Sequence, residues 1–273
     1  MSIDPLPDLP SSGGGERRAL RWAELDAGSL PPARREIVGA TWRERMRQEH
    51  LATGAFALLT QELAETGCAP VILSLVARAA ADEVRHAEVC RRMAVALLGE
   101  PAVPAGFKGV PNVPAHPGAS LADRALLHMV EMCCLSESLT AVYFTEMVAR
   151  ASHPVAKAVV ESLLEDEIDH SRVGWAYLAS RASGGTSREL VAEALPSLLD
   201  RTVGRALDDL DREADEDDPS MEAFGYLGHT TGAAAVRRAL DEVIVPGMQR
   251  LGVDVAPARE WAALRDARAP RNV

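Results

Sequence analysis

The chain has 273 residues, of which 47% are hydrophobic and 25% charged, so it is long and apolar enough for a globular protein with a sizeable core. Its formal net charge of −11 argues against a surface for nucleic acid and against attraction to anionic lipid. Only 4% of the residues are aromatic, which favours a core of packed helices over one of sheets. The four cysteines form no CxxC pair and indicate neither a disulfide framework nor a zinc site.

The N-terminal stretch MSIDPLPDLPSSGGGERR is rich in proline and glycine and lacks the basic-then-apolar order of a signal peptide. No continuous apolar run reaches the roughly 20 residues that a membrane-spanning helix needs. We therefore expect a cytoplasmic protein that has no membrane partner and whose residues 1–25 form a disordered tail.

Four long helices follow in chain order. Apolar periodicity predicts the first over 32–65, and the second is expected over 70–98, with a proline in its first turn and a glycine after its end. Five prolines within 101–118 exclude helix there. The third helix is expected over 120–151 and the fourth over 154–182.

This order of elements predicts an all-α fold, with a four-helix bundle over 26–182 that contains one long crossover. Additional C-terminal helices are expected to pack on the bundle over 183–260. They comprise 187–214, as one helix or as two broken near Pro196, and 221–251, with a kink or break at Pro246 and Gly247. Residues 261–273 are expected to be loosely ordered.

The same motif, Asp-Glu-x-x-His, occurs on the second and on the fourth predicted helix. Its members are Asp82, Glu83 and His86 in the first copy and Asp166, Glu167 and His170 in the second. A glutamate and a histidine three residues apart lie on one helix face, where both can bind the same metal ion. At these residue frequencies, two chance matches are expected in roughly fewer than one chain in a thousand.

The positions of the two short turns place four glutamates at one height. Glu83 follows the first turn, centred near 67, by 16 residues, and Glu49 precedes it by 18. Glu167 follows the second turn, centred near 152, by 15 residues, and Glu137 precedes it by 15. Because an α-helix rises about 1.5 Å per residue, all four side chains are expected in one layer near the middle of the bundle.

This layer contains the predicted metal ligands, which are Glu49, Glu83, His86, Glu137, Glu167 and His170. One glutamate from each of two helices and a Glu-x-x-His from each of the other two form a di-metal carboxylate site, and four carboxylates balance two divalent ions. A ligating histidine usually donates its other N–H to a carboxylate. We predict that Asp166 orients His86 and that Asp82 orients His170.

Alternatives remain at two of these positions. Glu44 competes for the ligand position on the first helix, and Glu131 competes for that on the third, although it lies six residues out of register. Tyr143 and Tyr177 are close enough in sequence to lie beside the site, although packed core residues are the stronger expectation for both. The histidines outside the motif are expected to be structural or exposed: His50, His116, His128, His153 and His229.

These residues resemble those of the ferritin-like di-iron carboxylate superfamily, which includes ferritins, rubrerythrins, ribonucleotide reductase small subunits and bacterial aminobenzoate-type N-oxygenases. The resemblance covers roughly 32–182 and rests on Glu49, DEVRH at 82–86, Glu137 and DEIDH at 166–170. The ligand spacings of 34, 54 and 30 residues are closest to those of the N-oxygenases and the reductase-like members. Leu163 stands where the N-oxygenases have an additional histidine.

The resemblance implies two iron ions, or a mixed Mn/Fe pair, in a non-haem di-iron oxidoreductase. Such an enzyme would use O₂ to oxidise a small organic substrate, with an external reductase as electron source and a homodimer as its expected assembly. An apolar or aromatic substrate would suit walls near Phe56, Cys133, Cys134 and Phe144. An iron-handling ferroxidase and a purely structural ferritin-like protein remain as alternatives.

Overall fold

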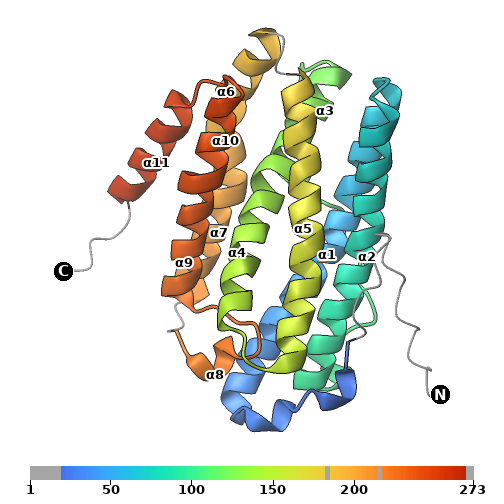
Figure 1. Cartoon of the computed structure of the whole chain (residues 1–273), viewed down its shortest axis with the longest axis vertical. Coiled ribbons are helices and arrows are strands. Elements are labelled where there is room, and N and C mark those ends of the chain that lie inside the picture. Colours follow the sequence, from blue (N-terminus) through green and yellow to red (C-terminus); the bar gives the residue numbers. More distant parts are fainter. Residues whose placement is uncertain (1–19, 182–184, 214–216, 269–273) are drawn as a thin grey trace.

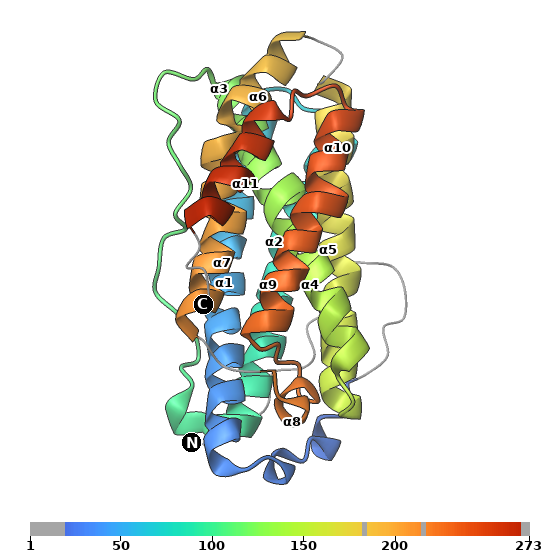
Figure 2. The same cartoon turned by 90° about the vertical axis from the view of Figure 1, so that its left-hand side faces the viewer.

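The computed structural model describes residues 20–181, 185–213 and 217–268, and every regular element in these ranges is helical (Figure 1). The predicted all-α class is therefore confirmed. The long helices lie side by side along the longest axis of the molecule, as the view in Figure 2 also shows. They are α1 (Pro32–Glu65), α2 (Pro70–Leu98), α3 (Leu121–Met129) with α4 (Glu137–Arg150), and α5 (Pro154–Arg181).

The ends of the long helices follow from proline and glycine. Pro32 and Pro70 occupy first-turn positions of α1 and α2, where a missing backbone N–H leaves no helical hydrogen bond unmade. After these helices, Gly67 and Gly99 have φ angles of 69° and 83°, a region that residues with a Cβ rarely adopt. The predicted bounds of α1 and α2 agree with the structure for this reason.

The third long helix contains a feature that the sequence did not predict. Between α3 and α4 the chain forms a π-helical segment, Val130–Ser136, without interrupting the helix. Leu121–Arg150 is, by length and composition, the one helix of the described ranges that could cross a membrane. However, 61% of its most apolar window is buried inside the protein, as expected for a core helix.

The crossover between α2 and α3 passes along the outside of α1 (Figure 2). His128 of α3 holds its end in place, because the ring Nε2 lies 2.8 Å from the backbone oxygen of Pro114. The other ring nitrogen of His128 lies 2.6 Å from Glu62 of α1. His128 is therefore a buried structural histidine that joins three segments.

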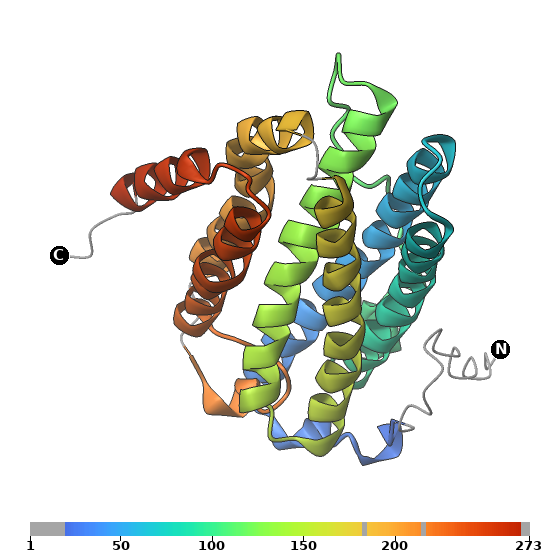
Figure 3. The same ribbon diagram turned by 45° about the horizontal axis from the view of Figure 1, so that its top comes forward.

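Of the C-terminal helices, that over 229–238 lies against α4, that over 185–199 lies against α3 and Val130–Ser136, and that over 256–268 packs on the helix over 185–199 (Figures 1 and 3). Most of their buried hydrophobic side chains belong to the same core cluster as side chains of α1, α3 and α5, whereas Met221 belongs to the cluster that contains Trp42 and Met46 of α1. The elements are α6 (Gly185–Leu199), α7 (Arg205–Glu213), α8 (Pro219–Glu222), α9 (His229–Arg238), α10 (Val245–Arg250) and α11 (Ala256–Arg268).

Prolines distort these helices less than the sequence predicted. Pro196 lies inside α6, which continues to Leu199, and a π-helical segment, Asp200–Gly204, joins it to α7. A second π-helical segment, Ala239–Ile244, precedes Pro246 and joins α9 to α10. Of the two alternatives for 187–214, the structure therefore agrees with one helix that continues past Pro196.

Parts of the two predicted tails, residues 20–25 and 261–268, are described by the structure and are ordered. Residues 20–25 are not disordered: they contain a 3₁₀ turn, Trp22–Glu24, and the Trp22 ring packs on the core and lies 5.6 Å from the Arg92 guanidinium. Residues 261–268 continue α11, where Arg265 donates to the backbone oxygen of Gly204 at 2.7 Å. Residues 1–19 and 269–273 lie outside the described ranges.

The core consists of two hydrophobic clusters that occupy different heights of the long helices. One contains Phe56, Leu59 and Leu63 of α1 together with residues of α5 beyond 172. The other contains Trp42 and Met46 of α1 together with residues of α5 before 164. Buried polar side chains fill the level between the two clusters. They come from the Asp-Glu-x-x-His motifs of α2 and α5, from one glutamate of α1 and from one glutamate of α4.

Candidate metal centre

The six predicted ligands meet in this polar layer, each from the helix on which the sequence placed it. Every one is at most 9% exposed: Glu49, Glu83, His86, Glu137, Glu167 and His170. Their ligand atoms form two groups, in each of which all atoms lie within 4.8 Å of one another. The first group comprises Glu49, Glu83, His86 and Glu167, and the second comprises Glu83, Glu137, Glu167 and His170.

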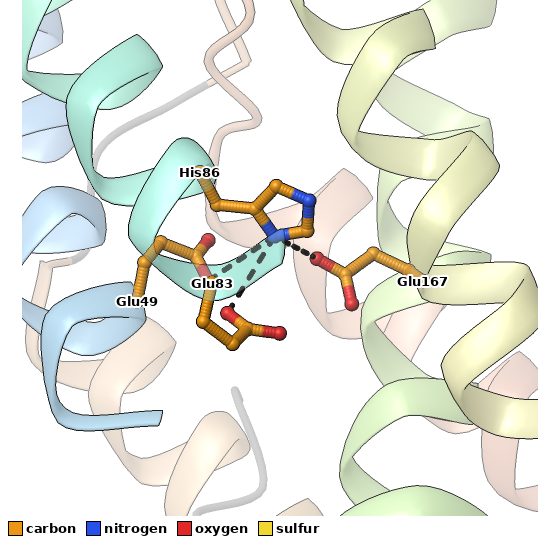
Figure 4. A group of neighbouring side chains, drawn as sticks. All are labelled: Glu49, Glu83, His86 and Glu167. Carbon is orange, nitrogen blue, oxygen red and sulfur yellow. Dashed lines mark ion pairs between the residues drawn. The ribbon is translucent and has the colours of Figure 1, made fainter. Parts of the chain in front are cut away.

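In the first group, three carboxylates converge on one imidazole nitrogen (Figure 4). His86 Nδ1 lies 3.2 Å from Glu167 Oε1 and 3.5 Å from Glu83 Oε2. Glu49 Oε2 lies slightly farther from the same nitrogen, at 3.9 Å. The three glutamates come from three different helices, so the tertiary fold and not one helix creates this group.

The second group mirrors the first around the other histidine. His170 Nδ1 lies 3.2 Å from Glu83 Oε1 and 3.4 Å from Glu167 Oε2. Glu137 completes the group from α4. The two imidazole rings are 5.8 Å apart between centroids.

Glu83 and Glu167 belong to both groups and present a different oxygen to each. Glu83 directs Oε2 to His86 and Oε1 to His170, whereas Glu167 directs Oε1 to His86 and Oε2 to His170. A carboxylate in this position can bridge two metal ions. Glu49 and Glu137 each belong to one group only and would each bind a single ion.

The hydrogen bonding of these atoms fits a metal site. Within the described residues, both carboxylate oxygens of Glu83, Oε2 of Glu167 and the Nδ1 atoms of both histidines are buried without a hydrogen-bond partner. Buried polar atoms are nearly always satisfied, so such a concentration of unsatisfied donor atoms requires an explanation. Two cations at the two groups would satisfy them.

Two aspartates lie behind the histidines in the pairing that the sequence predicted. His86 Nε2 is 3.0 Å from Asp166 Oδ2, and His170 Nε2 is 3.6 Å from Asp82 Oδ2. A carboxylate that accepts the Nε2–H leaves the Nδ1 lone pair directed at the metal position. Each aspartate is on the helix opposite its histidine, so the two pairs also connect α2 to α5.

Arginines hold these aspartates, and sequence reasoning missed them. Arg85, which is 7% exposed, donates to Asp166 and, through Nη1, to Ser162 Oγ at 3.0 Å. Arg78 forms a similar ion pair with Asp82 at 3.5 Å. Arg85 lies inside the motif DEVRH, and its position one residue before His86 was the only available signal.

Burial and neighbouring charges divide the acidic groups into two classes. Burial raises the pKa of Glu49 and Glu137 well above the usual range, and the adjacent glutamates raise it further. Burial also opposes ionisation of Glu83 and Glu167, but the charge of His86 and the hydrogen bonds of both histidines together outweigh it and lower the pKa of both carboxyls.

The pKa values of the two histidines are raised by the same cluster of charges. Burial alone would lower the pKa of His86 and His170, but the carboxylates that face each ring hold it well above the usual range. In the metal-free protein, two imidazolium cations therefore balance two carboxylates, while Glu49 and Glu137 favour their neutral forms. Two divalent ions would replace the two cationic rings and the two acidic protons without changing the net charge.

The π-helical segment positions Glu137, because it ends at the residue directly before this glutamate. Such segments are frequent at functional sites, where they change the direction in which side chains point. Gly174 of α5 lies against the same segment: an added Cβ would be 2.4 Å from the Cβ of Cys133. The absence of a side chain at Gly174 thus allows α5, one turn after His170, to approach α4.

The alternative ligands lie outside the cluster. Glu44 pairs with Arg47 at an exposed position, and Glu131 pairs with Arg201 through two hydrogen bonds. Tyr177 is a buried core residue, whereas Tyr143 lines a cavity beside the site. The buried cysteines Cys133 and Cys134 have thiol pKa values raised by burial, so they offer no thiolate to a metal.

A cavity of about 410 Å³ opens onto the cluster. Its walls include all four glutamates of the site, residues of α1 and α4, and residues of the C-terminal helices α7 and α9. Cavities of this size are typical of sites for small molecules. The C-terminal helices therefore contribute one wall of the space next to the candidate metal centre.

Comparisons with known proteins identify no relative. No protein-family model, no curated protein and no solved structure matches the chain. The chemistry of the site is therefore inferred from its geometry, its charge and its cavity.

Proposed function

We propose that this chain is a ferritin-like four-helix-bundle protein that acts as a non-haem di-iron oxidoreductase, using O₂ to oxidise a small organic substrate. The observation that carries the proposal is the placement of Glu83 and Glu167, each of which offers one oxygen to each histidine. In this proposal the first ion is held by Glu49, Glu83, His86 and Glu167, and the second by Glu83, Glu137, Glu167 and His170.

The donor set supports iron or manganese over softer metals. Carboxylates and imidazoles suit Fe and Mn, whereas the neighbouring thiols remain protonated. When bound, a pair of iron ions supplies electrons to O₂ and so permits oxidation of an otherwise unreactive organic molecule. An external reductase is the proposed source of those electrons.

The chain's own residues prepare the site for this reaction. Asp166 accepts the Nε2–H of His86 at 3.0 Å, and Asp82 faces Nε2 of His170 at 3.6 Å, so both aspartates leave Nδ1 directed towards the proposed ions. The two hydrophobic clusters above and below the layer exclude water from both sides. The cavity opens onto the cluster from the side of α1 and α4, where a substrate can approach the four glutamates.

This cavity favours substrate oxidation over iron storage, which is the second candidate function. Iron handling needs a path for hydrated cations, whereas the walls of this cavity include apolar side chains such as Phe144, Leu210 and Val236. Sustained O₂ consumption that requires both a reductant and an organic compound supports the oxidoreductase. Consumption that stops when each bound iron has been oxidised once supports iron handling.

Metal analysis of substituted proteins tests the site itself. Expressed with sufficient iron, the wild-type chain is expected to contain two metal ions, one for each group. Glu83→Ala and Glu167→Ala should each lose both ions, because each removes a shared ligand. The control Glu165→Ala, at an exposed position on α5, should retain them. Unchanged metal content in the first two variants would refute the metal centre.

A further inference from the structure

Arg45 of α1 is a buried cation in the wall of the cavity beside the candidate metal centre. Arg45 is 9% exposed, and its Nη1 atom is buried without a hydrogen-bond partner among the described residues. Its polar contact is weak, because Nη2 lies 3.6 Å from the sulfur of Met147. Buried arginines are normally paired with an anion, so this one lacks the group that its chemistry favours.

Two aromatic rings hold the guanidinium in place. It lies 4.5 Å from the ring centroid of Trp42 and 5.4 Å from that of Phe144. Trp42 is itself fixed, because its Nε1–H donates to the backbone oxygen of Phe224 at 2.9 Å. The rings position the charge without using its N–H donors, which remain available to a ligand.

The other charges around the cavity have partners of their own. At the mouth, Glu44 pairs with Arg47, and Asp209 pairs with Arg212. The four glutamates of the layer lie with the two histidines in the two candidate metal groups, where four carboxylates would balance two divalent ions. Arg45 is the only cation among the described residues that line the cavity, and no acidic side chain is left to neutralise it.

We propose that Arg45 anchors the substrate of this site and that the substrate is a small monocarboxylate with an apolar body. This proposal rests on the function proposed above and names the substrate class. The planar guanidinium matches a carboxylate through two parallel hydrogen bonds. Because Arg45 lies one helical turn before Glu49, a carboxylate bound there holds the rest of the molecule beside the metal ligands.

Apolar side chains in the cavity wall suit a substrate that has one negative charge and an apolar body. Ala52, Leu139, Phe144, Leu210 and Val236 line the same cavity. A dianion such as a phosphate would need a second cation, and the carboxylates near the mouth would repel its additional charge. The cavity volume of about 410 Å³ limits the substrate to a compact molecule.

Binding of hexanoate and of hexanamide to the full-length Zn²⁺-loaded chain, measured by calorimetry, tests the proposal. The two probes have the same shape and differ in charge, so this comparison needs no variant. Hexanoate should bind at least about tenfold more tightly than the amide, as expected for a charge-assisted pair. Equal affinities, or tighter binding of hexyl phosphate than of hexanoate, would overturn it.

Arg45→Met removes the charge with little change in volume, and Arg43→Met is the matched control because Arg43 is exposed on the same helix and does not line the cavity. The first variant should lose at least about tenfold in hexanoate affinity and keep that for hexanamide, whereas the control should keep both. Hexanoate affinity that depends on Zn²⁺ but not on Arg45 would place the carboxylate on the metal and contradict the proposal.

The two proposals fail separately in this design. Metal content is measured on the same samples, so absence of bound Zn²⁺ counts against the metal centre alone. Arg45 lacks an anionic partner with or without metal, and the comparison of acid with amide is therefore repeated on the metal-free chain. If hexanoate and hexanamide bind equally well to both the Zn²⁺-loaded and the metal-free chain, the result counts against the role of Arg45 alone.

Discussion

At the scale of single residues, Asp166 connects the candidate metal centre to the structure around it. One of its oxygens lies 3.0 Å from His86 Nε2, and the same oxygen accepts from Arg85. The carboxylate is 1% exposed, so little water can replace these contacts. Asp166 both fixes the orientation of a ligand and neutralises a buried arginine.

We predict that Asp166→Asn lowers metal affinity by about 10- to 100-fold, because an amide orients the His86 ring less well and leaves Arg85 without an anion. The measurement is a titration with Mn²⁺ or Zn²⁺. Asp169→Asn is the control, since Asp169 pairs with Arg172 at an exposed position three residues away. An affinity within about twofold of wild type in Asp166→Asn would contradict the orienting role.

Glu49 and Glu137 allow the two metal positions to be separated. Each belongs to one of the two groups, whereas Glu83 and Glu167 belong to both. Glu49→Gln should therefore weaken only the ion at His86, and Glu137→Gln only the ion at His170. Titration with Co²⁺ should reveal one ion retained per chain in each variant, and loss of both ions from either one would contradict the assignment.

The sequence indicated the ligands but not the arginines. The four glutamates and two histidines have a repeated motif and a common register, both of which are visible in one sequence. Arg85 and Arg45 carry no such signal, because an arginine on a helix is usually exposed, and only the tertiary contacts bury these two. Motif and register in one sequence therefore predict which acidic and histidine side chains meet in the bundle better than they predict the buried arginines around them.

At the scale of elements, α1 and α2 were predicted to the residue because proline begins each of them and glycine follows each of them. The π-helical segment Val130–Ser136 was not predicted. It contains neither proline nor glycine, and its effect on apolar periodicity is too small to detect over seven residues. Its position becomes evident only from the packing of α5 against it.

We predict that Gly174→Ala destabilises this packing. The new methyl would lie 2.4 Å from Cys133 Cβ and 2.9 Å from its backbone carbonyl carbon, so α5 and α4 must move apart. Overpacking of this kind costs about 1–3 kcal/mol, measurable by urea unfolding. The ion at His170 should also bind more weakly, because Gly174 is one turn after that ligand.

Gly106→Ala is the control for this substitution, since nothing lies within 4 Å of its added Cβ. Its free energy of unfolding should stay within about 0.5 kcal/mol of wild type. Equal stabilities for Gly174→Ala and Gly106→Ala would mean that the close approach of α5 to the π-helical segment is not needed.

At the scale of the whole molecule, the polar layer separates two hydrophobic clusters that together stabilise the fold. Four buried carboxylates and two imidazoles in one layer weaken a core unless cations compensate them. Metal binding and folding should therefore be linked, because the unfolded chain does not hold the ligands together.

The metal-free chain should become less stable as the pH rises. His86, His170, Glu49 and Glu137 all have pKa values that folding raises. The stability that such groups contribute is complete below their unfolded pKa values and is lost as the pH rises through their folded ones. Glu83 and Glu167, with lowered pKa values, contribute above their unfolded pKa and lose this contribution only in acid.

The stabilisation that bound metal gives to the folded chain should, in contrast, increase as the pH rises. Divalent ions compete with the protons of the histidines and of Glu49 and Glu137, so the gain in melting temperature on adding Zn²⁺ should increase from about pH 6 to about pH 9. At a free metal concentration of about 1,000 Kd the gain corresponds to about 4 kcal/mol. Thermal unfolding with EDTA and with Zn²⁺ across this range measures it. A Glu83→Gln/Glu167→Gln double variant should show almost no gain at any pH, and a wild-type gain that falls with rising pH would contradict the exchange of protons for metal.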